Sequence, residues 1–189
     1  MDKRPGHFWL DFVSCFLIPA YTLLFAGSVR WFGTNFSVLA VTGADHYRGF
    51  VYWGVLAGGY FYVMLSRLAS ALPRRETRTL TRLLTACAAL SLAYAVAIPY
   101  LPQNFPKYAA LHVLLAALAC VLLMLTLLVI LLALHRQDPH RWVRLLRAWG
   151  LIALACAILF LIPRMVSTAL EVFFTISTVL LTRKIRLNF

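Results

Sequence analysis

Six long runs of apolar residues, separated by short polar and basic connections, divide the chain from one end to the other. A helix needs about 20 residues to cross the hydrocarbon core of a bilayer, and each run reaches or approaches that length. The runs predict transmembrane helices at 8–29, 50–66, 80–100, 108–134, 145–162 and 166–182. We therefore expect an all-α polytopic membrane protein, a bundle of six transmembrane helices in a single domain covering residues 1–189.

Two of these runs have an alternative interpretation. The last two could form one helix, but 145–182 would then be about 57 Å long, well beyond the hydrocarbon core. Pro163 and Arg164 indicate a turn between them. The first run could be a cleaved signal peptide, but its length and Asp11 favour a retained helix, which Pro19 is expected to kink.

The composition supports a membrane location. The chain is 62% hydrophobic and 13% charged, and this much apolar surface is too large for the interior of a soluble domain of 189 residues. Fourteen of the Lys and Arg residues lie at the two termini and in the second and fourth connections, against four in the other connections. This asymmetry predicts a protein of the cell (cytoplasmic) membrane with both termini in the cytoplasm. The net charge of +12 is then expected to interact with lipid headgroups and not with nucleic acid.

One face of the last run is polar. The residues that share this face, at intervals of three or four, are Arg164, Thr168, Glu171, Thr175, Thr178 and Thr182. A charge in hydrocarbon costs several kcal/mol, so the stripe must face protein or water. By helical rise, His112 lies at a depth comparable to that of Glu171. We expect Glu171, His112, Arg164, Thr168 and Thr175 to line an outward-facing pocket that binds or translocates a small solute, a proton or a lipid.

These groups also have structural interpretations. Thr168 and Glu171 fit a capping box in which Thr168 is the N-cap of the last helix. His112 is either a proton carrier or ligand, or an interhelical hydrogen-bond partner. Threonines in apolar helices often bond their own backbone one turn back. At the cytoplasmic side, Asp11 is an isolated acid, and we expect a structural ion pair with Arg67 or with Arg147.

Two further segments bear on the packing of the bundle. Gly54 and Gly58 are four residues apart, which lets helix backbones approach closely, and we expect this contact to form within the chain. The first outer loop, 30–47, is more apolar than an exposed loop requires. It either folds over the bundle as a lid or lies with its aromatic residues in the headgroup layer.

Three local features resemble the DRAM-type membrane proteins and related bacterial six-helix families of uncharacterised function. They are the first-loop run Asn35-Phe36-Ser37-Val38-Leu39, His112 early in the fourth predicted helix and Glu171 early in the sixth. The resemblance covers the whole chain as topology and these segments as residues. It implies a membrane-resident, non-enzymatic protein and does not indicate a substrate.

The sequence contains no recognisable catalytic or nucleotide-binding motif. There is no Walker loop, HExxH or dinucleotide fingerprint, and the four cysteines have no metal-ligand spacing. We therefore expect no cofactor, no metal and no catalytic residue. The alternative to solute binding is an accessory or assembly subunit of a membrane complex, with a membrane-protein partner or a second copy of the chain. A lipid-modifying enzyme using His112 and Glu171 is the least supported hypothesis.

Overall fold

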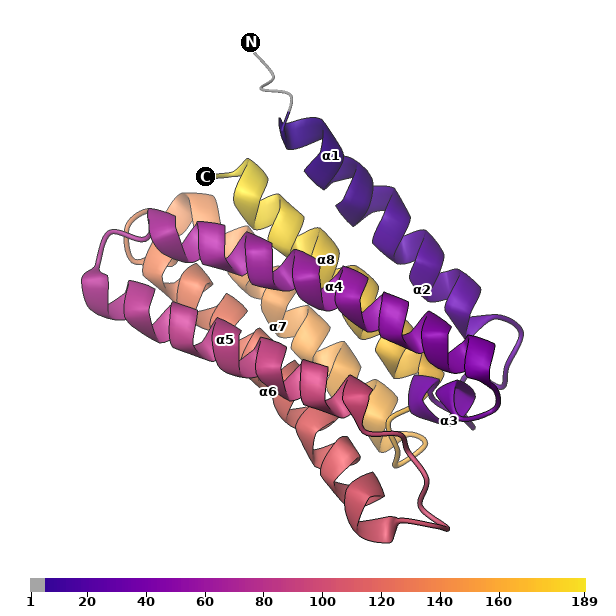
Figure 1. Cartoon of the computed structure of the whole chain (residues 1–189). Helices are drawn as coiled ribbons and strands as arrows, with labels where there is room; N and C mark the ends of the chain where they lie inside the picture. The colour runs from indigo at the N-terminus through magenta and orange to yellow at the C-terminus, as the bar shows by residue number, and fades with distance from the viewer. Residues whose placement is uncertain (1–5) are drawn as a thin grey trace.

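The computed structural model describes residues 6–189, and every regular element in that range is a helix (Figure 1). The all-α prediction is confirmed. The elements in chain order are α1 (Gly6–Phe12), the π-helical turn η1 (Val13–Leu17), α2 (Ile18–Ala26), α3 (Phe36–Ala40), α4 (Ala44–Ala71), α5 (Arg75–Ala97), α6 (Pro106–His135), α7 (Pro139–Leu161) and α8 (Thr168–Leu187). The elements α1, η1 and α2 follow one another without a break and form the first long helix.

Five helical segments are long and apolar enough to cross a membrane, which indicates a membrane protein. They are Phe8–Ala26, Ala44–Ala71, Arg75–Ala97, Pro106–His135 and Pro139–Leu161. The sixth predicted span corresponds to α8, a separate helix of 20 residues. It differs from the others because Glu171 near its start and Arg183, Lys184 and Arg186 near its end leave only a short uncharged stretch. The predicted turn at Pro163 and Arg164 is confirmed, since α7 ends at Leu161 and α8 begins at Thr168.

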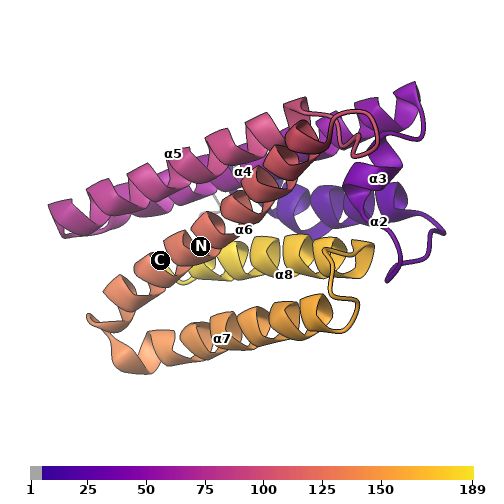
Figure 2. The ribbon, with the colours of Figure 1, turned by 90° about the horizontal axis from the view of Figure 1, so that it is seen from below.

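The helices run roughly side by side, and their ends fall into two groups. Helix α5 packs against both α4 and α6, while α8 contacts α2, α4 and α7. The turns α4–α5 and α6–α7 and the C-terminus lie at one end of the bundle, and α3 lies at the other (Figure 1). Helix α7 lies at an outer edge, beside α6 and α8 (Figure 2). The arginine-rich connections therefore share one end.

The close approach of α4 and α5 depends on two glycines. A Cβ atom on Gly54 would lie 2.8 Å from Val96 Cγ2, and a Cβ on Gly58 would lie 2.9 Å from Leu92 Cδ2. Real Cβ atoms do not approach carbon this closely, so a side chain at either position would force its neighbour to move. Val96 is branched at Cβ and stiff, whereas the end of the flexible Leu92 side chain can shift. The prediction of an intramolecular contact at Gly54 and Gly58 is confirmed.

The first long helix is irregular just before Pro19. The Ile18 N–H donates to the Val13 carbonyl, five residues back, which defines the π turn. Proline has no N–H, and its ring conflicts with the carbonyl four residues earlier. The irregularity expected at Pro19 therefore takes the form of a wider turn over the preceding residues.

Candidate functional site

The first turn of α8 is capped by the first loop as well as by its own residues. The N-cap is Ser167, whose hydroxyl accepts from Leu170 N–H at 3.4 Å. The Thr168 N–H donates to the Thr34 carbonyl at 2.7 Å, and the Ala169 N–H donates to the Trp31 carbonyl at 2.9 Å. The backbone donors that a helix start leaves unpaired are thus satisfied by loop carbonyls. The capping-box interpretation, with Thr168 as N-cap, is wrong.

Glu171 caps a different helix from its own. Its Oε2 accepts a 2.7 Å hydrogen bond from the backbone N–H of Phe36, the first residue of α3. Asn35 is the N-cap of α3: its Oδ1 accepts from Val38 N–H, and its Nδ2 donates to the Val166 carbonyl at 3.3 Å. A carboxylate is favoured at a helix start, where backbone N–H groups are unpaired. Glu171 is only partly buried, and its contact joins α8 to the first loop.

His112 links three segments. It is 2% exposed, with its Nδ1 2.8 Å from the Ile98 carbonyl oxygen and its Nε2 2.6 Å from Ser37 Oγ. Because a carbonyl oxygen only accepts, Nδ1 is the donor. In the neutral ring, Nε2 then accepts from the Ser37 hydroxyl. His112 therefore fastens α6 to the end of α5 and to α3.

Glu171 and His112 contact adjacent residues of the same short helix, α3. Glu171 binds the backbone of Phe36, and His112 contacts the side chain of Ser37. Through Phe36 and Ser37, the first loop therefore contacts α8 and α6, as the lid interpretation expects. Trp31 and Phe32 of the same loop are exposed. We call this group of contacts, made by Glu171, His112, Phe36 and Ser37, the outer latch.

The other predicted site residues are not part of the outer latch. Arg164 is exposed and takes φ of 54°, a left-handed conformation in the turn before α8. Thr168 is fully buried, and its hydroxyl donates to the Thr34 carbonyl at 3.0 Å. Thr175 is 3% exposed. The hydroxyls of Thr178 and Thr182 bond their own backbone one turn back, as the structural interpretation proposed.

The five predicted site residues line neither of two grooves on the described surface. One groove, of about 510 Å³, lies between the α5–α6 connection and α6, and its lining is apolar. The other, of about 310 Å³, lies at the opposite, arginine-rich end. An outward-facing pocket at Glu171 and His112 therefore stays a prediction.

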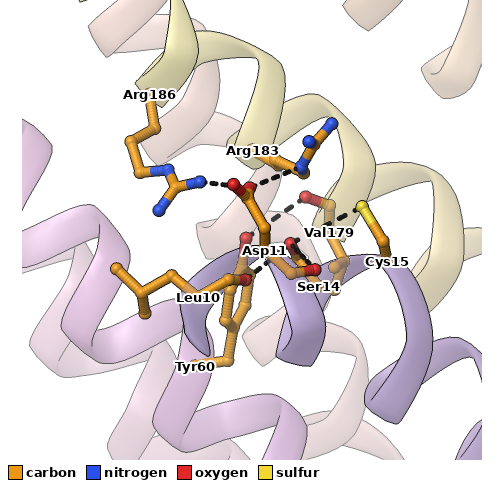
Figure 3. Close-up of polar contacts among 8 residues, drawn as sticks. All are labelled: Leu10, Asp11, Ser14, Cys15, Tyr60, Val179, Arg183 and Arg186. Carbon is orange, nitrogen blue, oxygen red and sulfur yellow. Dashed lines mark hydrogen bonds and ion pairs between the residues drawn. The ribbon is translucent and has the colours of Figure 1, made fainter. Parts of the chain in front are cut away.

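A second polar cluster joins the first helix to the last (Figure 3). Arg183 Nε donates to Asp11 Oδ1 at 2.7 Å, and Arg186 Nη2 donates to the same oxygen. The expectation that Asp11 pairs with Arg67 or with Arg147 is wrong, because α8 supplies the partners and both of those arginines are exposed. Nearby, the Tyr60 hydroxyl donates to the Val179 carbonyl, and the Ser14 hydroxyl donates to the Leu10 carbonyl. Sequence reasoning missed the two arginines, although their three-residue spacing places them on one helix face.

The comparisons with known proteins do not extend this picture. No protein family model, curated protein or solved structure matches the chain. The resemblance to the DRAM-type families therefore stays a prediction. Its three segments do lie together in the fold, since the first-loop run contacts both His112 and Glu171. Among the described residues, no group of three or more His, Cys, Asp or Glu side chains is placed to hold a metal ion.

Proposed function

We propose that this chain is a six-span protein of the cell membrane, with both termini in the cytoplasm, that acts as a non-catalytic accessory or assembly subunit. The sixth span is α8, whose contacts with α2, α4 and α7 let its polar face turn toward neighbouring helices. The cytoplasmic assignment rests on the arginine-rich turns, which share one end with the C-terminus.

This topology has a direct test. A reporter that is active only in the cytoplasm, fused after Phe189, is expected to be active. The same reporter inserted after Gln103, in the α5–α6 connection, is expected to be inactive. Activity at Gln103 together with inactivity at the C-terminus would reverse the orientation, and equal activity at both would contradict the six-span arrangement.

The subunit proposal rests on one observation: polar side chains of α8 make hydrogen bonds within the chain. The Glu171 carboxylate contacts α3, and the Thr168 hydroxyl contacts the first loop. The hydroxyls of Thr178 and Thr182 contact their own helix. Side chains that already make internal hydrogen bonds are not free to bind a solute, and binding through them would require these bonds to break.

The proposed partner surface is the outer face of α7. Trp142 is the one residue of this 23-residue helix that is buried. Four of its exposed large side chains lie on one face at helical spacing: Leu151, Leu154, Ile158 and Leu161. Phe160, which is 46% exposed, lies on the opposite face. Beside them, Gly150 meets nothing within 4 Å of an added Cβ, so no packing inside the described chain explains its small size. Small residues at an open helix face allow another helix to approach closely.

Site-specific photo-crosslinking in the native membrane tests this surface. A crosslinking residue at Leu154, which is 58% exposed, is expected to give one discrete adduct with a partner protein or a second copy of the chain. The matched control is Tyr94 on α5, which is 62% exposed and is expected to crosslink only lipid. Gly150→Phe should abolish the Leu154 adduct without lowering thermal stability in detergent. Lipid adducts alone at both positions would reject the proposal.

A second candidate function is proton or small-solute binding at the outer latch. It is favoured by one observation, that both titratable side chains hold the same short helix α3. A protonated Glu171 is a weaker acceptor for Phe36 N–H, and a doubly protonated His112 no longer accepts from Ser37. Proton uptake would then release α3. In reconstituted vesicles, this function requires proton or solute flux that is lost in Glu171→Gln although that variant, destabilised by only about 1 kcal/mol, remains folded.

A further inference from the structure

The arginine-rich end of the bundle contains a groove of about 310 Å³ between the α4–α5 turn, the start of α5 and the end of α6. Its residues fall into two groups. The polar ones, at the end of the bundle, include Arg74, Arg136 and Gln137, and the apolar ones, further along the helices, include Leu80, Val129 and Leu132. We call it the basic groove.

The two arginines of the basic groove are free of acidic partners. The ion pairs among the described residues join Arg48 to Asp45, and Arg183 and Arg186 to Asp11. Arg74 and Arg136 take part in none of these pairs, and both are exposed. No carboxylate lines the groove. The groove therefore carries two arginines that form no ion pair within the described chain. The acids nearest to them in sequence, Glu76 and Asp138, are not among the residues that line it.

The start of helix α5 also favours binding of an anion in the basic groove. Helix α5 starts at Arg75, and its N-cap, Arg74, makes no side-chain capping bond to the first turn. Thr77, in that first turn, lines the groove. A helix start carries partial positive charge and unpaired N–H donors. Arg78 fixes the turn that presents Arg74, because its Nη2 donates to the Leu72 carbonyl at 3.0 Å.

We propose that the basic groove binds one anionic phospholipid, with its phosphate between Arg74 and Arg136 and the start of an acyl chain along Leu80, Val129 and Leu132. The order of the lining supports this occupant. Arg74 and Arg136 lie in connections between helices, and Leu80, Val129 and Leu132 lie within segments apolar enough to cross a membrane. An amphiphile with a negative headgroup matches this order, whereas a free phosphate matches only the charged part.

Lipid binding to the purified full-length protein tests the proposal. Native mass spectrometry would titrate phosphatidylglycerol and phosphatidylcholine separately, with sn-glycerol 3-phosphate as the soluble probe that lacks acyl chains. We expect preferential binding of phosphatidylglycerol and no competition by glycerol 3-phosphate. Arg74→Gln/Arg136→Gln should weaken phosphatidylglycerol binding by roughly thirtyfold, since each interfacial arginine contributes independently.

Two further variants distinguish lipid binding in the basic groove from nonspecific attraction to the positive charge of this end of the bundle. Arg75→Gln/Arg144→Gln removes the same charge from exposed positions outside the groove and should change the affinity by less than about threefold. Ala133→Trp keeps the charge but fills the groove, and it should abolish the preference. The proposal is overturned if the control pair weakens binding as much as Arg74→Gln/Arg136→Gln. It is also overturned if Ala133→Trp retains the preference at unchanged thermal stability, or if glycerol 3-phosphate competes with the lipid.

Discussion

The Glu171 carboxylate accepts a 2.7 Å hydrogen bond from the backbone N–H of Phe36, so the last helix holds the first residue of the loop helix α3. The Phe36 side chain is fully buried and packs edge-on against Phe25 and Trp53, with ring centroids 5.0 Å and 5.1 Å away. The single contact therefore joins the acid of α8 to an aromatic anchor that lies between the first loop, α2 and α4. The outer latch therefore contributes to the packing of the bundle.

Replacing Glu171 should lower stability in a graded way. Glu171→Gln keeps an oxygen that accepts from Phe36 N–H but removes the charge, and it should cost about 1 kcal/mol. Glu171→Leu leaves that buried N–H without an acceptor and should cost roughly 2–3 kcal/mol. Thermal unfolding in detergent measures both. If Gln and Leu were equally harmless, the contact would contribute nothing to the fold.

His112 and Ser37 should be energetically coupled. His112→Ala removes the partner of the Ser37 hydroxyl and also leaves the Ile98 carbonyl without its donor. We expect Ser37→Ala to cost about 1 kcal/mol, and His112→Ala to cost more. In the double variant, the loss should be smaller than the sum of the two. A double-mutant cycle on thermal stability tests this, and strict additivity would mean that the contact does not form in solution.

The helical architecture could be predicted from the sequence because it depends on local patterns. Hydrocarbon favours long apolar runs, so each predicted run falls in a separate helix. The break after α7 followed from Pro163, and a close helix contact at Gly54 and Gly58 followed from their spacing, although the partner helix α5 did not. These features need no knowledge of which helices are neighbours.

The exact partners could not be predicted because they depend on which helices are neighbours. Thr168 and Ser167 both suit an N-cap by residue type, and Ser167 takes that role where the Thr34 carbonyl already binds the Thr168 N–H. Asp11 was expected to face Arg67 or Arg147, but α8 packs against the first helix and supplies Arg183 and Arg186. Single-sequence patterns give the faces of helices, not their pairing.

The corrected ion pair gives a prediction with an internal control. Asp11→Asn leaves Arg183 and the nearly buried Arg186 without a carboxylate and should cost roughly 1–2 kcal/mol. Arg67→Gln should change nothing measurable, because Arg67 is exposed. Thermal stability in detergent at low and high salt measures both. The opposite ranking, with Arg67→Gln the more harmful, would restore the pair expected from the sequence.

The glycines of α4 provide a test of the helix packing itself. Gly54→Ala places a methyl group 2.8 Å from Val96 Cγ2, and Gly58→Ala places one 2.9 Å from Leu92 Cδ2. Forcing a methyl group against the stiff Val96 side chain should cost about 1–3 kcal/mol. Gly58→Ala should cost less, because the end of the flexible Leu92 side chain can turn away. Gly59→Ala, one residue further along, meets nothing within 4 Å and should be neutral or stabilise by up to about 1 kcal/mol, since alanine favours the helix. Thermal unfolding of the three variants in the same detergent decides this. A Gly59→Ala loss equal to that of Gly54→Ala would mean that the outer face of α4 is covered in the native assembly.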